Sequence, residues 1–140
     1  MTERVDFYVL KSNNARQRWV FACRLIEKAY LKDLRVVVAN DTPADARALD
    51  DLLWTFNERS FIPHDVAQSN ITVEPALPAA AELLVNLTAG LPADWERFNR
   101  VAEIIDADED RRRLGRERFK AYRDSKVTVE THQLDDGADG

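Results

Sequence analysis

The first 55 residues alternate between strand-like and helix-like segments, and this order limits the possible folds more than any other feature of the chain. The run VDFYVL at 5–10 predicts a strand, and RVVVA at 35–39 predicts a short β-branched strand of the kind that parallel sheets bury on both faces. A helix-like segment follows each strand, at 15–31 and from about 44 to 53 or 54. The first carries an apolar stripe at helical spacing, and a helix-start signature precedes the second: Trp19, Ala22, Cys23, Ile26 and Tyr30 form the stripe, and Asn40, Asp41 and Thr42 before Pro43 form the signature. This order predicts an α/β fold with a mostly parallel central sheet flanked by helices.

The remainder of the chain continues the pattern within one domain. Further strands are predicted at 71–73, 83–87 and 127–129, and Trp95 and Phe98 suggest a short helix. Residues 101–105 favour a strand, although an apolar run this short leaves a helix open. A length of 140 residues suits a single domain. We expect residues 1–134 to form it and the acidic segment 135–140, DDGADG, to be a disordered tail.

The predicted topology resembles that of nucleotide-binding domains, but the chain lacks a nucleotide site of the usual kind. Close approach to a phosphate requires glycines in the first strand–helix turn, which here reads LKSNNAR. The four glycines lie elsewhere, at Gly90, Gly115, Gly137 and Gly140. No GxxxxGK[ST] or GxSxG motif occurs. We therefore expect no catalytic residues and no enzyme activity, although a hidden acid–base pair among the many carboxylates stays open.

Cysteine and histidine are too scarce to suggest a metal or cofactor. Cys23, His64 and His132 are the only such side chains, and a zinc site needs about four ligands, or three and water. No apolar run reaches the roughly 18 residues that span a membrane. The N-terminal residues also lack the pattern of a signal peptide, and a single cysteine forms no internal disulfide. The expectation is a cytoplasmic protein without cofactor, metal or membrane partner.

A basic segment stands out against this acidic background. Residues 111–123, RRRLGRERFKAYR, hold seven bases and one acid, in a chain whose net charge is −5. Acidic residues at 106–110 precede them, and acids before bases suit the dipole of a helix from about Asp108 to Arg123. Leu114 and Ala121 are its expected core contacts. One face of this helix combines five residues: Arg112, Arg116, Phe119, Lys120 and Arg123.

Three interpretations of this face are open. It is a solvated surface whose bases offset the surrounding acids, or a receptor for an anionic and partly apolar ligand. A short acidic peptide that ends in an aromatic residue and a free carboxylate would fit such a receptor. The third interpretation is direct contact with single-stranded nucleic acid, which a chain with a net charge of −5 makes less attractive.

A second informative segment, LDDLLWTFNERSFIPHD at 49–65, concentrates aromatic residues where a helix gives way to a loop. Phe56 and Ile62 are expected to close the core. Trp54 and Phe61 suit either the core or an interface, where such side chains are typical anchors. His64 after Pro63 is interpreted as a loop residue that forms hydrogen bonds, since no second histidine or cysteine neighbours it.

Together these two segments carry a family resemblance. LDDLLW at 49–54, SFIPH at 60–64 and RERFKAYR at 116–123 are similar to the motifs of the chi subunit of bacterial DNA polymerase III holoenzyme. The resemblance covers residues 4 to about 134. It implies an α/β fold without a nucleotide site and a non-catalytic role in DNA replication. Chi links the clamp-loader complex, through the psi subunit, to the acidic C-terminal tail of single-stranded DNA-binding protein, and so meets DNA only indirectly.

The resemblance also assigns residues to two sites. The psi-binding positions are Trp54 and Phe61, with Pro63 and His64 shaping the loop, and a helicase is left open as a second partner there. Phe119 stands where the family commonly has tyrosine, which keeps the apolar wall and loses a hydroxyl. The site for the tail of single-stranded DNA-binding protein would consist of Arg112, Arg116, Phe119, Lys120, Ile105 and Thr131.

Overall fold

The structure is a computed structural model that describes residues 2–12, 14–32, 34–55, 71–74, 82–92 and 95–134. It confirms the alternation of strands and helices. The first half contains β1 (Arg4–Leu10), α1 (Ala15–Leu31), β2 (Val36–Ala39), α2 (Pro43–Thr55) and β3 (Ile71–Glu74). The second half contains β4 (Leu83–Asn86), a 3-10 helix η1 (Trp95–Arg97), β5 (Arg100–Ile105), α3 (Glu109–Asp124) and β6 (Thr128–Leu134). The predicted tail at 135–140 lies outside the described residues.

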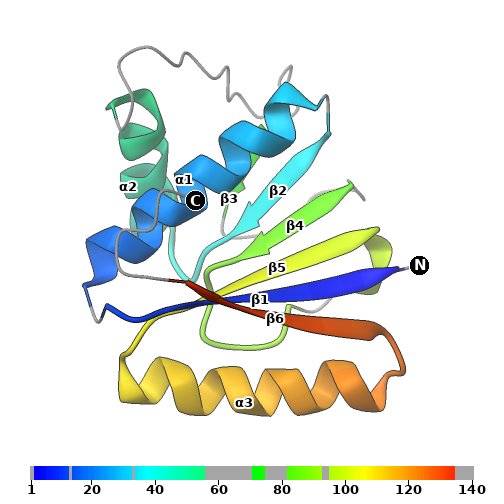
Figure 1. The fold of residues 1–140 in the computed structure, drawn as a ribbon. Helices are drawn as coiled ribbons and strands as arrows, with labels where there is room; N and C mark the ends of the chain where they lie inside the picture. The colour runs from blue at the N-terminus through cyan, green and yellow to red at the C-terminus, as the bar shows by residue number, and fades with distance from the viewer. Residues whose placement is uncertain are drawn as a thin grey trace.

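The strands form one six-stranded sheet in the order β3-β2-β4-β5-β1-β6. Every described pair is parallel. In Figure 1, α1 and α2 lie on one side of the sheet and α3 lies on the other. The α/β fold with a parallel sheet and flanking helices is thus confirmed.

The structure resolves one open prediction and extends another, both of them concerning strands. Residues 101–105 form β5 rather than a helix, and they are buried because helices cover both faces of the sheet at this central position. Strand β6 extends beyond the predicted 127–129 as far as Leu134. Its polar residues are held in the sheet because they pair in register with β1 along the whole strand, from Arg4 with Thr128 to Leu10 with Leu134.

The sheet separates two apolar clusters. The cluster beneath α1 includes three residues of the predicted stripe, Ala22, Cys23 and Ile26, while Trp19 packs against its edge. Burial raises the pKa of the Cys23 thiol to about 12, so this side chain behaves as a small apolar residue. The cluster beneath α3 is built around Val5, Phe7, Leu84, Trp95, Phe98, Val101, Ile105 and Tyr122.

Helix α3 begins where the charge pattern predicts, but its core contacts differ from the prediction. The Asp108 side chain caps the helix by accepting the Arg111 backbone N–H. The buried residues are Gly115, Arg118 and Tyr122, whereas the predicted contacts Leu114 and Ala121 are only half-buried. Glycine allows a close approach to β5, since a Cβ at position 115 would lie 2.9 Å from Cδ1 of Ile105.

None of the described helices combines the length and the apolar character that a membrane-spanning helix requires.

Candidate functional site

The seven bases of residues 111–123 divide according to whether they form an ion pair with a carboxylate of the same chain. Three of them do: Arg111 with Asp106 at 2.7 Å, Arg113 with Asp110 at 3.7 Å and Arg118 with Glu103 at 3.0 Å. The other four have no carboxylate partner among the described residues. We call these four the cationic face of α3: Arg112, Arg116, Lys120 and Arg123.

The cationic face is exposed along its whole length. Its members recur at the three- and four-residue spacing that places side chains on one side of a helix. Nε of Arg112 donates to the backbone carbonyl of Asp106 at 3.1 Å, which orients this guanidinium without neutralising it. The Arg123 guanidinium lies 6.0 Å from the centre of the Phe119 ring, within cation–π range. The face therefore presents positive charge beside an aromatic ring.

Phe119 connects the cationic face to the core. Its ring is half-buried and packs against Phe7 of β1, with 5.3 Å between the ring centroids. Thr131 is exposed on β6 and lies in register with Phe7 in the adjacent strand, so both side chains project toward α3. The structure thus brings Phe119 and Thr131 to the same edge of the sheet, as the assigned site requires.

Ile105 contributes in a different way. It is 5% exposed and lies beneath Gly115, so it supports α3 from below and offers little surface to a ligand. Sequence analysis missed Phe7 as the residue between Phe119 and Thr131. The alternation of VDFYVL would have placed it on the same strand face as Val5, and Val5 also packs beneath α3.

A buried polar network fixes which side of α3 faces outward. Glu103 is fully buried and receives hydrogen bonds from Arg118, from the Tyr122 hydroxyl at 2.6 Å and from Asn86 Nδ2 at 2.8 Å. A second Arg118 nitrogen donates to the Ala89 carbonyl at 2.7 Å. Burial raises the pKa of Glu103, and the charge of Arg118 opposes that rise. Burial and the Glu103 charge together raise the pKa of Tyr122.

Asp106 fixes the start of α3 in the same manner. This carboxylate is fully buried and accepts two hydrogen bonds from Arg111, at 2.8 and 2.7 Å, and one from the Asp108 N–H at 3.2 Å. Burial alone would raise the pKa of Asp106, but these bonds outweigh burial and lower it below its usual value. The turn that holds Arg112 is therefore rigidly placed.

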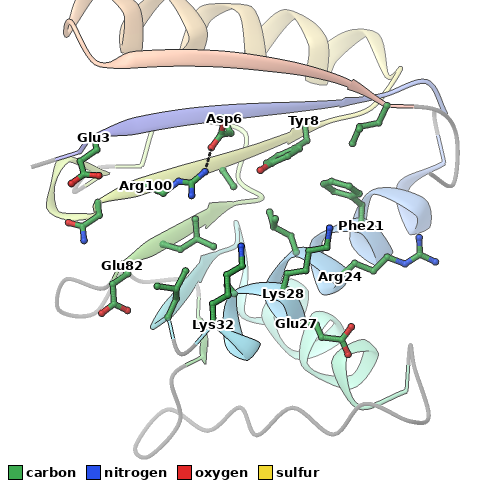
Figure 2. A pocket seen from close by; sticks show the side chains of 17 residues that line it. Glu3, Asp6, Tyr8, Phe21, Arg24, Glu27, Lys28, Lys32, Glu82 and Arg100 are labelled. Atoms are coloured by element: carbon green, nitrogen blue, oxygen red, sulfur yellow. Dashed lines mark hydrogen bonds and ion pairs between the residues drawn. The ribbon is translucent and has the colours of Figure 1, made fainter. Parts of the chain in front are cut away.

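A third carboxylate, Asp6, lies on the opposite face of the sheet beside a cavity of about 770 Å³ (Figure 2). Asp6, Glu130 and His132 are close enough to share a cation. However, Asp6 already pairs with Arg4 at 2.8 Å, Arg100 at 2.9 Å and His132 at 2.9 Å. Two guanidinium groups so near would repel a metal ion, so we interpret this cluster as structural.

The predicted psi-binding residues fall largely outside the described structure. Trp54 lies in the last turn of α2, and nothing is described of its side chain. Phe61, Pro63 and His64 lie outside the described residues, so their assignment stays a prediction.

Comparisons with known proteins agree on one family. The family described as DNA polymerase III chi subunit, HolC, matches residues 1–130. DNA polymerase III subunit chi of Pseudomonas aeruginosa is 34% identical over 137 residues, covering 94% of this chain and 96% of that protein. The subunit chi of Escherichia coli is 26% identical over 118 residues, covering 78% and 80%. That of Haemophilus influenzae is 22% identical over 132 residues, covering 88% and 92%.

Proposed function

This chain belongs to the DNA polymerase III chi subunit family of replication accessory subunits, and we propose that it acts there as a non-catalytic connector. One surface binds the psi subunit of the clamp-loader complex. The other binds the acidic C-terminal tail of single-stranded DNA-binding protein, in the cytoplasm where chromosomes are copied. One observation supports the second contact: the cationic face of α3 has no carboxylate partner among the residues that the structure describes, and it lies beside the half-buried Phe119 ring.

The pattern of internal pairs favours a receptor over a merely solvated face. If the bases of α3 only offset neighbouring acids, the acids nearest to them would be their partners. Among the described residues, only Arg113 does this, with Asp110. Asp106 and Glu103 pair with Arg111 and Arg118, and the cationic face has no carboxylate partner in the described part of the chain. Unpaired arginines can form charge-assisted hydrogen bonds to incoming carboxylates, bidentate where geometry allows.

The aromatic part of the surface suits the last residue of such a tail. Phe119 is held against Phe7, so its exposed edge forms a fixed apolar wall that needs no ordering upon binding. Thr131 borders this wall from β6. An aromatic side chain followed by a free carboxylate could then place its ring near Phe119 and its charge near Arg116 or Lys120.

The contact with psi is assigned to Trp54, Phe61, Pro63 and His64. Burial of several hundred Å² of apolar surface at ~25 cal/mol/Å² would contribute several kcal/mol before the costs of association. The tail contact is weaker and sensitive to salt. A partner that presents several tails would compensate through avidity.

The test is a calorimetric titration with a short acidic peptide that ends in phenylalanine, alongside the same peptide with an amidated C-terminus. Amidation and Arg116→Ala should each weaken binding by about 10- to 100-fold, which corresponds to losing one hydrogen bond between charged groups. Arg47→Ala is the matched control, because Arg47 is also an exposed helical arginine but lies in α2.

Two results would contradict the tail assignment. The first is equal affinity for the free-acid and the amidated peptide. The second is binding that does not change when the salt concentration rises from about 0.05 to about 0.5 M. Tight binding to a bare oligonucleotide, lost in Arg116→Ala, would instead support direct contact with single-stranded nucleic acid.

A further inference from the structure

A second cavity, of about 570 Å³, lies at the carboxyl ends of β2 and β4. Residues that follow these two strands form one wall, the start of α1 and one side of α2 form the others, and Arg111 of α3 also contributes. In open α/β sheets, ligands bind outside the carboxyl ends of the strands. The polar lining of this cavity combines three arginines with two carboxylates and two neutral side chains: Arg16, Arg18, Arg111, Asp41, Asp45, Asn40 and Thr88.

Arg18 is a buried cation that forms no ion pair with any carboxylate in the described part of the chain. It is 6% exposed, and its recorded hydrogen bond runs from Nε to the Ile104 carbonyl at 2.8 Å. The charges of Asp106 and Glu103 favour its cation from beyond ion-pair distance, whereas the like charges of Arg111 and Arg118 oppose it. Burial, reinforced by Arg111, lowers the pKa of Arg18 to about 10. Buried charges in proteins are normally paired, so an anion in this cavity would satisfy Arg18.

Asn40 supplies an independent sign of a missing acceptor. It follows β2, is 3% exposed and lines the same cavity. Its Nδ2 is the one buried side-chain polar atom without a hydrogen-bond partner in the described part of the chain. An amide N–H₂ group can only donate, so its natural partner is an oxygen acceptor.

We propose that this cavity binds a phosphate-type oxyanion, either free phosphate or the end of a small phosphate monoester. Arg18 and the exposed Arg16 supply the planar donors that match phosphate oxygens, and Asn40 lines the same cavity. These side chains take the role that glycine-rich backbone plays in other α/β sites, which explains how the glycine-free turn LKSNNAR is compatible with anion binding.

The remaining lining suits the organic part of a monoester. Trp19 and Leu52 provide an apolar wall. Asp41 lies at the start of α2 and accepts the Ala89 N–H at 3.3 Å. Its carboxylate would repel a second anion but could accept a ligand hydroxyl. The cationic face of α3 does not line this cavity, so the site is independent of tail binding.

The test uses the full chain and inorganic phosphate, measured by calorimetry and by thermal shift against chloride at equal ionic strength. Adenosine monophosphate and adenosine form the second arm. Saturable binding of phosphate above the chloride background supports the site. If adenosine monophosphate binds more tightly than phosphate and adenosine does not bind, the ligand is a phosphate monoester whose organic part contacts the apolar wall. If phosphate and the monophosphate bind equally, the ligand is the free anion.

Three variants locate the site. Arg16→Gln should weaken phosphate binding by about tenfold, and Arg18→Met should abolish it. Asn40→Leu removes the unpaired donor, so it should raise the melting temperature of the free protein while weakening phosphate binding. Arg47→Gln, an exposed arginine of α2 outside the cavity, should change neither. If Arg18→Met does not fold, phosphate binding by Arg16→Gln and Asn40→Leu tests the proposal. Phosphate binding that is absent, or unchanged in these variants, overturns the proposal.

Discussion

Replacing Arg118 by methionine is expected to destabilise the protein strongly, whereas the same change at Arg116 is expected to leave its stability almost unchanged. The two arginines lie two positions apart in α3 but in opposite environments. Arg118 is 5% exposed and its Nε lies 3.0 Å from the fully buried Glu103. Arg116 is exposed and has no carboxylate partner among the described residues.

The size of the effect follows from what Arg118→Met leaves behind. Removing one partner of a buried ion pair typically costs about 3–5 kcal/mol, because the other charge stays buried and unpaired. Glu103 would retain its hydrogen bonds from Tyr122 and Asn86, so we expect the lower end, about 3 kcal/mol. That is a large fraction of the 5–15 kcal/mol by which domains are usually stable. Arg116→Met should stay within about 0.5 kcal/mol.

Urea unfolding at pH 7, followed by circular dichroism, measures both variants. The double variant Arg118→Met with Glu103→Gln should recover part of the lost stability, since neither position of the former ion pair then carries a charge. Burial raises the pKa of Glu103 above its ordinary 4.5, so its protonated form is favoured in the folded state once Arg118 is gone. The deficit of Arg118→Met should therefore shrink as the pH falls toward 4.5. A deficit under about 1 kcal/mol, or one that does not depend on pH, would refute this account.

Three further predictions concern other parts of the molecule. Asp6→Asn should lower the free energy of unfolding by about 1–3 kcal/mol at pH 7, as measured by urea titration. Burial alone would raise the pKa of Asp6, but its hydrogen bonds lower this pKa below 3.8 in the folded protein. The difference from the parent protein should therefore disappear as the pH falls through the folded-state pKa. Gly115→Leu should lower the free energy of unfolding by about 1–3 kcal/mol, because the new side chain forces α3 away from Ile105. Thermal unfolding measures this loss, and Gly90→Leu is the control because a Cβ at position 90 would meet no described atom within 4 Å. Trp54→Ala should weaken psi binding in pull-down titrations and leave affinity for the acidic peptide unchanged; equal loss of both would indicate misfolding instead.

The strands and helices were largely predictable because their signals are local. The apolar stripe of residues 15–31 lies within α1, and the start signature at 40–43 leads directly into α2. The charge order from Asp108 onward likewise predicted α3. Strand β6 was underestimated because its polar residues owe their conformation to pairing with β1, far away in the sequence.

The roles of individual arginines in α3 could not be predicted from spacing. Arg118 looks like any other base in RERFKAYR, and its partner Glu103 lies 15 residues earlier in a different element. Its burial also depends on Asn86 and Ala89 near the end of β4, which no helical periodicity describes. The expected core contacts Leu114 and Ala121 were therefore wrong, because a buried ion pair displaced apolar side chains from the inner side of the helix.

The composition of the cationic face follows from this internal pairing. Glu103 and Asp106 are fully buried at the end of β5 and just beyond it, and each draws one arginine of α3 inward. Those two contacts set both the rotation of the helix about its axis and its position along β5. Four of the five remaining bases, those of the cationic face, are consequently turned outward together, and Phe119 packs on Phe7 beside them. Because buried ion pairs fix the position of α3, its unpaired charges can bind a partner without being needed for folding. This is the physical reason why Arg116 is expected to affect peptide binding and Arg118 to affect stability.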